Sequence, residues 1–402
     1  RPCLRCRPES APDSPAWRGA STTVQRALQL MRQGALNEGS LANLAARLGV
    51  GERYLRKLFQ RELGVSPQAV ALNQRLLFAK KLLAETTLPI TEVAFAAGFG
   101  SVRRFNSAVQ THFRLTPGQL RGRRGAGASD QGISLQLHYR PPYDWEGVMD
   151  FFRHHAVAGV ETVSDQAYRR NFSSGGEPVW LEVRRGRKAN TLELELQLPN
   201  HSELLATVNR VRRMFDLDAN PAVIEAALGQ SPAFSKLLQA RPGSRSPGHW
   251  SLFESAIRAV VGQQVSTAAA KGICARLAAT CSPAGHIVFP TAAGIAALDD
   301  SHFPMPGRRR ETLRALCSRY SEREDELNLD ALAEFKGVGP WTVAMVAIRG
   351  AGEPDIFPRG DLGLERTWDK ISDSSGKLLE QSEQWRPWRS YAANLLWRNY
   401  GQ

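Results

Sequence analysis

The stretch LAEFKGVGPWTVAMVAIRG (332–350), followed by DIFPRGD (355–361), decides the fold of this chain. A Gly-Val-Gly turn separates two apolar runs with helical character, and a lone carboxylate, Asp361, comes shortly after them. Glycines in such a turn let backbone N–H groups approach a phosphate closely, because no side chain blocks them. The pattern therefore predicts a hairpin that holds a DNA backbone, with a carboxylate beside it. The predicted hairpin residues are Lys336, Gly337, Val338 and Gly339.

Length and composition indicate a multidomain globular protein. A chain of 402 residues should form two to four domains, and 42% hydrophobic with 23% charged residues excludes a disordered chain. No apolar run approaches the ~18 residues of a membrane span, and no secretory segment opens the chain. We therefore expect a cytoplasmic protein with no membrane partner. Because residue 1 is Arg, we also expect a piece of a longer protein.

The net charge of +13 is concentrated at one end of the chain. Residues 1–132 hold 20 Lys and Arg against 8 Asp and Glu, whereas residues 133–402 hold 32 against 31. Such an asymmetry is typical of a nucleic-acid-binding module. A basic surface without a partner would have the same composition, so the motifs have to decide between the two.

Two helix-turn-helix patterns lie in the basic part. Gly49 separates two helical runs in LANLAARLGVGERYLRKLFQRELGVSP (41–67), and Gly98 does so in ITEVAFAAGFGSVRRFNSAVQTHFRLTP (90–117). We expect a long helix, RLLFAKKLLAETTLPI (75–90), between them. The second helix of each pattern is apolar on one side only, which leaves its polar side chains to meet bases and phosphates. The predicted operator contacts are Arg53, Arg56, Lys57, Arg103, Arg104 and Asn106.

This doubled pattern resembles the AraC-type DNA-binding domain over residues 20–121, with the endings GVSP and LTP and the run EVAFAAGF at the family spacing. The resemblance implies a sequence-specific regulator that binds promoter DNA and contacts RNA polymerase. A generic helical bundle is the structural alternative. The residues alone do not separate a true regulator from a domain that only tethers the chain to DNA.

A Cys-x-x-Cys pair precedes this domain. Structural zinc needs four ligands, so Cys3 and Cys6 make only half a site. The run RPCLRCRP (1–8) resembles the end of the methyl-acceptor zinc domain of Ada-type proteins. The resemblance implies that Cys3 and Cys6 bind zinc in a longer protein, whose other ligands and methyl-accepting cysteine are not in this sequence.

Strand patterns open the rest of the chain. ISLQLHY (133–139) and TLELELQL (191–198) alternate apolar and polar residues, and VWLEVRR (179–185) should pair with the second of them in a β-hairpin. Residues 211–402 are mostly helical in pattern, with few alternating runs.

From residue 133 onward the chain resembles 3-methyladenine DNA glycosylase II (AlkA type), a helix-hairpin-helix enzyme. The matching stretches include RPPYDWEGVMDFF (140–152), RAVVGQQVS (258–266) and WRPWRSYAANLLW (385–397). The implied fold is multidomain and mainly α: a helix-turn-helix bundle, a TATA-binding-protein-like α+β domain and an all-α helix-hairpin-helix glycosylase core. The expected boundaries are 1–19 for the zinc-domain remnant and linker, 20–121 for the AraC-type domain, 122–132 for a flexible linker, 133–210 for the α+β domain and 211–402 for the glycosylase domain.

Asp361 is the candidate catalytic residue. An alkylated purine leaves its sugar as an uncharged base, so the enzyme mainly needs a carboxylate to stabilise positive charge on the sugar. Asp is also a favoured helix cap, and Asp361 precedes the helical run LGLERTW (362–368), so it fits both roles. The resemblance places Asp361 at the catalytic position. It also places Trp341 where bifunctional relatives carry a Schiff-base Lys, which implies hydrolysis without strand cleavage and without a cofactor.

The resemblance also implies a pocket for the damaged base. An electron-rich ring attracts a cationic base by about 1–2 kcal/mol per stacked contact. Trp341, Trp397 and Phe151 match pocket aromatics of the family, whereas Met345 and Leu362 stand where a family member has tyrosines. We therefore expect a more apolar pocket with less stacking.

Two further roles follow from the resemblance. Gln264 replaces the family leucine that fills the gap left by the flipped base, and a plug at this point offsets part of the cost of unstacking. The hairpin also resembles members that hold a monovalent cation between backbone carbonyls and a DNA phosphate. The matching positions are Ala333, Phe335 and Val338.

We therefore expect a base-excision repair enzyme that flips and releases 3-methyladenine or 7-methylguanine from double-stranded DNA. It would be fused to a regulator of the adaptive response to alkylation, and action on DNA would make it nucleoid-associated in the cytoplasm of a bacterium. The alternative is a DNA-binding regulator whose glycosylase half is a non-catalytic scaffold. The presence of Asp361, Trp341 and the hairpin favours the enzyme.

Overall fold

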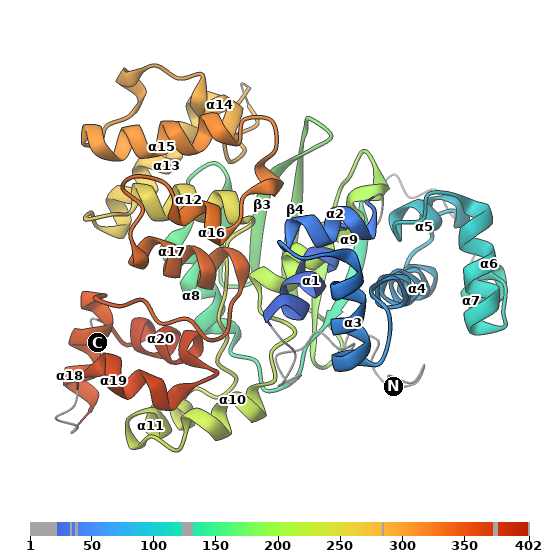
Figure 1. The fold of residues 1–402 in the computed structure, drawn as a ribbon, viewed down its shortest axis with the longest axis horizontal. Coiled ribbons are helices and arrows are strands. Elements are labelled where there is room, and N and C mark those ends of the chain that lie inside the picture. Colours follow the sequence, from blue (N-terminus) through green and yellow to red (C-terminus); the bar gives the residue numbers. More distant parts are fainter. Residues whose placement is uncertain are drawn as a thin grey trace. The chain divides into compact units, whose positions relative to one another are not determined.

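The computed structural model describes residues 22–32, 34–36, 39–122, 132–283, 285–372 and 377–400. The chain forms two compact units. The first comprises Arg1–His138 and Ser174–Arg212, and the second comprises Tyr139–Ser173 and Arg213–Gln402. Helices predominate in both units (Figure 1), so the predicted multidomain, mainly α fold is confirmed. The expected segment 133–210 is shared between the units, and most of the expected linker 122–132 lies outside the described residues.

Both predicted helix-turn-helix patterns are present in the first unit. Gly49 and Gly98 have φ angles of 67° and 79°, a left-handed conformation that ends the first helix of each pattern at little cost for glycine. The helices of this part are α1 (Thr22–Arg32), α2 (Leu41–Arg47), α3 (Glu52–Leu63), α4 (Pro67–Glu85), α5 (Ile90–Ala96), α6 (Val102–Phe113) and α7 (Pro117–Arg121).

The long helix between the two patterns differs from its predicted bounds of 75–90. It begins at Pro67, because the Ser66 hydroxyl caps it by accepting the N–H of Ala69, and a proline is tolerated at the first helical position. It ends at Glu85, because the next residue, Thr86, is extended, with a φ of −119° and a ψ of 164°.

An antiparallel sheet completes the first unit. Strand β5 (Thr191–Leu196) lies between β1 (Ile133–His138) and β4 (Glu177–Arg185), which confirms the predicted hairpin of β4 and β5. Helix α4 contacts the edge strand β1, because Glu85 accepts the N–H of Gln136 and Lys81 donates to the carbonyl of that residue. The unit ends with η2 (His201–Glu203) and α9 (Leu204–Met214), of which α9 continues to the first residues of the second unit.

The second unit is built almost entirely of helices. Its strands β2 (Glu161–Val163) and β3 (Ala167–Ser174) pair in antiparallel fashion. Its α-helices are α8 (Trp145–His155), α10 (Pro221–Leu228), α11 (Pro232–Ala240), α12 (Leu252–Val261), α13 (Thr267–Cys281), α14 (Ala292–Ala296), α15 (Gly307–Arg319), α16 (Leu329–Ala333), α17 (Pro340–Val346), α18 (Leu362–Ile371), α19 (Leu378–Ser382) and α20 (Arg389–Arg398). Short 3-10 turns are η3 (Asp300–His302), η4 (Glu324–Glu326) and η6 (Glu383–Trp385), and η5 (Ala347–Ala351) is a π-helical turn.

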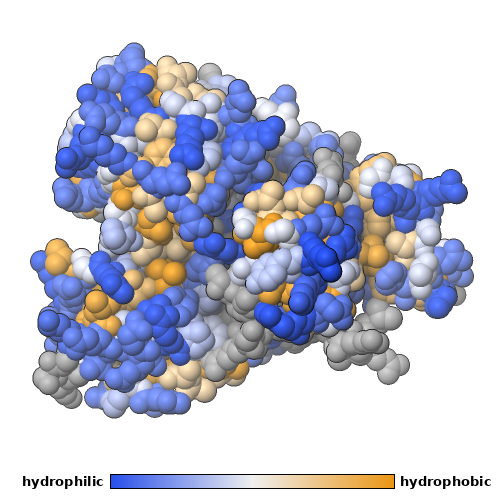
Figure 2. Space-filling model, viewed as in Figure 1, coloured by the Kyte–Doolittle hydropathy of each residue, from blue (hydrophilic) through white to orange (hydrophobic). Residues whose placement is uncertain are grey.

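Two apolar clusters stabilise this unit. One gathers buried residues of α12, α13 and α15 with Val346 of α17, and the other gathers residues of α10, α11, α18 and α20 around Trp368 and Trp385. Figure 2 shows apolar residues gathering over α17, between the more hydrophilic surfaces of α15 and α19. Helix α17, which contributes Val346 to the first cluster, therefore lies under an apolar part of the surface.

Four buried charges pair with one another in the second unit. Arg170 and Arg258 each contact both Glu161 and Glu254, with Arg258 at 2.7 Å from either carboxylate. Burial alone would raise the pKa of Glu161, but the two guanidinium groups outweigh it and hold the pKa at about 2. Two cations and two anions give a neutral group, which joins β2 and β3 to α12.

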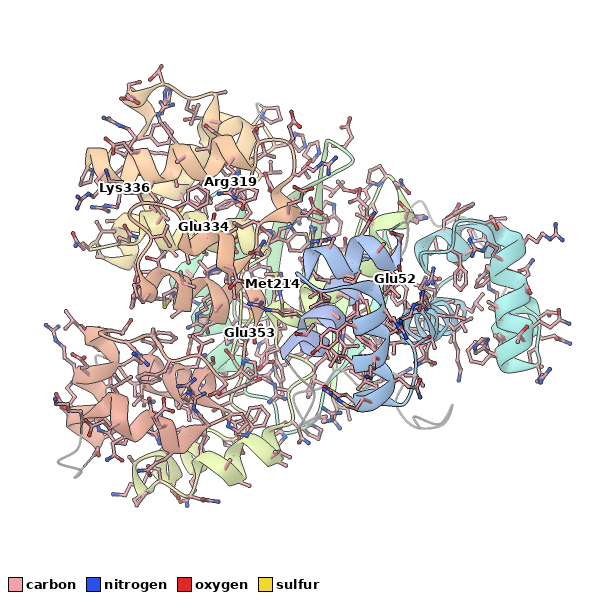
Figure 3. All side chains as sticks on the ribbon, in the orientation of Figure 1. Glu52, Met214, Arg319, Glu334, Lys336 and Glu353 are labelled. Atoms are coloured by element: carbon pink, nitrogen blue, oxygen red, sulfur yellow. The ribbon has the colours of Figure 1, made fainter. Side chains whose placement is uncertain are left out.

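Removing one member should leave the others unbalanced. We expect Arg258→Met to lower the free energy of unfolding of the full chain by about 3 kcal/mol or more in urea denaturation, since both glutamates would lose a partner inside the protein. The matched control is Arg319→Met, which breaks the exposed pair of Arg319 and Glu334 (Figure 3) at a cost of about 1 kcal/mol or less. Equal losses in the two variants would contradict the stabilising role of the buried group.

A half-buried carboxylate, Asp216, lies in the turn after α9. Its oxygens accept the N–H of Ser246 at 2.9 Å and the hydroxyl of Tyr391 at 3.2 Å. Burial raises its pKa to about 7, despite the opposing effects of Arg245 and of these hydrogen bonds. Its φ of 49° is left-handed, a region that asparagine also tolerates.

Asp216→Asn should therefore stabilise the protein only at higher pH. The unfolded carboxyl titrates near pH 4 and the folded one near pH 7, so its stabilising contribution is complete below pH 4 and lost as the pH rises through 7. We expect the stability of the variant relative to the wild type to rise by about 2–3 kcal/mol from pH 5 to pH 8, in denaturation curves at the two pH values. A difference between variant and wild type that is the same at both pH values would exclude titration of Asp216 as the cause.

Candidate active site

Asp361 begins helix α18 and caps it. Its Oδ1 accepts the N–H of Leu364 at 3.1 Å, so the capping role considered from the sequence is present. Two indoles also donate to this carboxylate: Trp341 Nε1 to Oδ2 at 2.9 Å and Trp397 Nε1 to Oδ1 at 3.1 Å. A carboxylate can accept all three N–H groups at once, because each oxygen has two lone pairs. The side chain is half-buried and held in one orientation.

The two tryptophans come from different helices of the second unit. Trp341 lies in the first turn of α17 and Trp397 near the end of α20, which packs on the other apolar cluster. Gly363 lies close to this carboxylate: a Cβ there would be 3.2 Å from Asp361 Oδ1, a tight contact, and 3.8 Å from Trp397 Cδ1, an ordinary one. Sequence reasoning did not single out this glycine.

The other predicted pocket residues surround this centre less closely. Met345 packs against the cluster of α12 and α15, and Leu362 is 63% exposed beside Asp361. Phe151 is buried, and its ring neighbours are His155 at 4.4 Å and the guanidinium of Arg349 at 4.4 Å. The structure therefore brings Asp361 together with both tryptophans. Phe151 is connected to them only by Arg349, whose guanidinium contacts the rings of both Phe151 and Trp397.

Arg349 is a site residue that sequence reasoning missed, although it lies in the stretch that decides the fold. It is buried in the π-helical turn η5, a distortion frequent at functional sites, and its Cζ lies 4.9 Å from the ring centre of Trp397. Burial lowers its pKa to about 9, and the charge of Asp361 acts in the opposite direction. The sequence did contain a signal for it: Arg349 is the one charged residue in the apolar run VAMVAIRG (343–350).

The predicted hairpin lies between α16 and α17. Gly337 has a φ of 90°, and a Cβ there would lie 2.3 Å from Thr312 Oγ1, so only glycine fits without displacement. Thr312 donates its hydroxyl to the carbonyl of Lys336 at 2.7 Å and thereby ties the hairpin to α15. Among the described residues, the N–H groups of Gly337 and Gly339 meet no acceptor, whereas that of Val338 donates to Phe335 O at 3.0 Å. The Lys336 side chain is exposed at the outer edge of the unit (Figure 3).

Gln264 lies in the turn between α12 and α13. It is exposed and has a left-handed φ of 56°, which is unusual for a residue other than glycine. Its neighbour Gln263 donates to Gly337 O and to Thr342 Oγ1, both at 2.9 Å. The turn that carries Gln264 is thus attached to the hairpin.

The predicted operator residues lie on the second helix of each helix-turn-helix pattern in the first unit. All six are exposed, while apolar residues of the same helices are buried: Leu55, Leu58 and Phe59 in α3, and Phe105 and Val109 in α6. Arg56 is paired with Glu52 at 2.6 Å, so it would have to exchange this partner for DNA. The predicted positions are Arg53, Arg56 and Lys57 in α3 and Arg103, Arg104 and Asn106 in α6.

Cys3 and Cys6 lie outside the described residues. Within the described ranges, no three His, Cys, Asp or Glu side chains are placed to hold a metal ion. The same ranges contain no helix of the length and hydrophobicity that a bilayer crossing demands.

Two families match the chain. Residues 44–123 match the helix-turn-helix domain family, and residues 134–251 match the AlkA N-terminal domain family. Part of the chain has the same fold as a 3-methyladenine DNA-glycosylase from Archaeoglobus fulgidus. The two superpose with a TM-score of 0.57 at 19% identity, over 65% of this chain and 96% of that structure.

Relatives of known description extend the match along the chain. A protein of Mycobacterium tuberculosis described as a probable bifunctional transcriptional activator/DNA repair enzyme AlkA is 38% identical over 423 residues, which cover 99% of this chain and 84% of that protein. DNA-3-methyladenine glycosylase 2 of Escherichia coli is 32% identical over 284 residues, which cover 66% of this chain and 97% of that enzyme. The chain therefore belongs to the AlkA family of bifunctional proteins, in which an AraC-type helix-turn-helix domain is joined to a DNA glycosylase.

Proposed function

We propose that the second unit releases 3-methyladenine and 7-methylguanine from double-stranded DNA by hydrolysis of the N-glycosidic bond. The observation that carries this proposal is the carboxylate of Asp361, oriented by the indole N–H groups of Trp341 and Trp397. The names of the relatives, a DNA repair enzyme and a DNA-3-methyladenine glycosylase, support the substrate class.

Asp361 would act on the sugar. As the C1′–N bond breaks, its electron pair leaves with the base and positive charge develops on the sugar ring. A carboxylate fixed by three N–H donors is already oriented for that charge, so little reorganisation is needed when the bond breaks. Water then adds at C1′ and an abasic site remains. With Trp341 in place of a Schiff-base lysine, the strand stays intact.

The base would be held by aromatic and apolar side chains. The faces of Trp341 and Trp397 would stack on the flipped base. Met345 and Leu362 would add apolar contacts. Phe151 would contribute indirectly, through its contact with Arg349. The scaffold alternative, a glycosylase fold without catalysis, does not account for a carboxylate oriented by both tryptophans.

The hairpin and the turn with Gln264 would hold the DNA. The N–H groups of Gly337 and Gly339 and the ammonium group of Lys336 suit a phosphate, and Gln264 would fill the gap left by the flipped base. The carbonyls of Ala333, Phe335 and Val338 would hold a monovalent cation. Of these, the Phe335 carbonyl already accepts the N–H of Val338, which leaves it one lone pair for an ion.

The first unit would bind promoter DNA through the exposed residues of α3 and α6 and contact RNA polymerase there. Zinc at Cys3 and Cys6 would belong to the longer protein, and a cytoplasmic, nucleoid-associated location would follow from action on DNA. Domain boundaries at 1–19, 20–121, 122–132, 133–210 and 211–402 fit these functions.

Base release from dimethyl-sulfate-treated duplex DNA tests the enzyme. We expect wild type to free methylated purines and leave the strand uncut until alkali is added. Asp361→Asn should be slower by about a hundredfold or more, because the neutral amide no longer stabilises the sugar cation. The control is Asp369→Asn, an exposed carboxylate later on the same helix, which should retain the wild-type rate. Wild-type binding of DNA without base release would support the scaffold instead.

Footprinting on the promoter of the protein's own gene tests the regulator. In the full chain, Arg53→Ala and Arg103→Ala should each weaken protection at one half-site about tenfold, as loss of a base contact does. The control Arg187→Ala removes an equal charge from an exposed loop of the first unit, and it should change protection little. Protection spread evenly over any DNA, in wild type as in the variants, would show a tether and not an operator-binding domain.

A further inference from the structure

Arg349 is one of two buried arginines of the second unit that make no ion pair with a described residue; the other, Arg245, donates instead to four backbone carbonyls. Arg170 and Arg258 each contact two glutamates, whereas Arg349, only 5% exposed, makes no ion pair with any described residue. Its Nη1 donates to the carbonyl of Pro247 at 2.8 Å. A buried charge without an ion-pair partner is costly, so its presence beside a candidate active site calls for a functional reason.

Aromatic rings hold this guanidinium in place. Its Cζ lies 4.4 Å from the ring centre of Phe151 and 4.9 Å from that of Trp397, within the range of cation–π attraction. Two histidines lie on the same side, but burial keeps the pKa of His155 at about 3 and that of His249 well below its usual value. Both histidines are therefore neutral near pH 7, so the positive charge in contact with the rings of Phe151 and Trp397 is that of Arg349.

Trp397 connects this cation to the catalytic candidate. The guanidinium of Arg349 meets the ring of Trp397, and the indole N–H of the same side chain donates to Asp361. A base stacked on Trp397 would thus be near a fixed positive charge, while its sugar would be near a fixed negative charge. This placement of the base rests on the proposed function.

Bond cleavage moves charge in the direction that these two groups favour. The electron pair of the C1′–N bond goes to the base, which becomes more negative by one unit, and the sugar becomes positive. We propose that Arg349 assists the departure of the base by stabilising this electron pair, as Asp361 does for the sugar cation. A fixed charge acts in this way when it faces the place where opposite charge develops.

Arg349 should affect the binding of a damaged base and its cleavage in different ways. A base that is cationic before cleavage, such as 7-methylguanine, is repelled by Arg349 in the ground state and relieved of this repulsion in the transition state. A neutral base such as hypoxanthine is not repelled on binding but also gains electrons on leaving. Arg349 should therefore speed cleavage of both and weaken the binding of the cationic base only.

Single-turnover kinetics with excess enzyme on duplexes containing one 7-methylguanine or one hypoxanthine separates the two effects. For Arg349→Met we expect the cleavage rate constant to fall about tenfold or more on both bases, in proportion to the lost charge stabilisation. The enzyme concentration giving half the maximal rate should fall severalfold for 7-methylguanine and stay unchanged for hypoxanthine. Arg349→Gln, which keeps a donor for the Pro247 carbonyl, should behave in the same way and replaces the Met variant if that one does not fold.

Two controls separate charge from packing. Arg349→Lys keeps the charge and should keep most of the cleavage rate. Arg245→Met removes another buried arginine that stacks on an aromatic ring, 4.7 Å from Tyr143, and has no contact with Trp397 or Asp361. It should lower stability without changing the cleavage rate constant.

The proposal is overturned if Arg349→Met and Arg349→Gln cleave at the wild-type rate, or if Arg349→Lys is as slow as they are. It is also overturned if the neutral variants bind 7-methylguanine more weakly, since that result indicates a packing role alone. Failure of the proposed function gives a different result, because the wild type itself would then release no base.

Discussion

The acceptance of two indole N–H groups by Asp361 is the interaction on which the candidate site depends. Trp341 belongs to α17, on the side of one apolar cluster, and Trp397 belongs to α20, on the side of the other. The carboxylate is therefore positioned by both halves of the second unit, and by the first turn of α18 that it caps. A change in how the two clusters pack would therefore move the carboxylate.

The second unit treats its buried charges in two ways. Around Glu161 and Glu254, cations and anions balance, and the group serves to join a β-hairpin to α12. At the site, charges of opposite sign are kept apart by the ring of Trp397, with Asp361 at its N–H and Arg349 at its ring. Separated charges produce a field across the space between them, whereas a neutralised group does not. This difference distinguishes structural from functional charge in the same small region.

The DNA-binding features depend on backbone conformation as much as on side chains. Gly337 allows the hairpin to pack against Thr312, and this leaves N–H groups of the turn without acceptors among the described residues. Gln263 attaches the turn that carries Gln264 to the same hairpin. The hairpin that would bind a phosphate and the turn whose Gln264 would enter the base stack are therefore joined by a hydrogen bond.

Sequence patterns determined the class of this protein and many of its elements. Leu55, Leu58 and Phe59 recur with helical spacing, and the alternation in 191–198 has the period of a strand, so the helix-turn-helix patterns and the β4–β5 hairpin followed from local spacing. The bounds of α4 were less predictable, because the Ser66 cap and Pro67 extend the helix before its apolar stripe begins. Asp361, Trp341 and Trp397 were identified by resemblance, but their hydrogen bonds were not, since they join residues far apart in the chain. Only the tertiary structure showed Arg349 to be a buried cation on Trp397: a sequence gives the residue type, whereas packing decides its depth, its ring neighbours and the absence of an ion pair within the described residues.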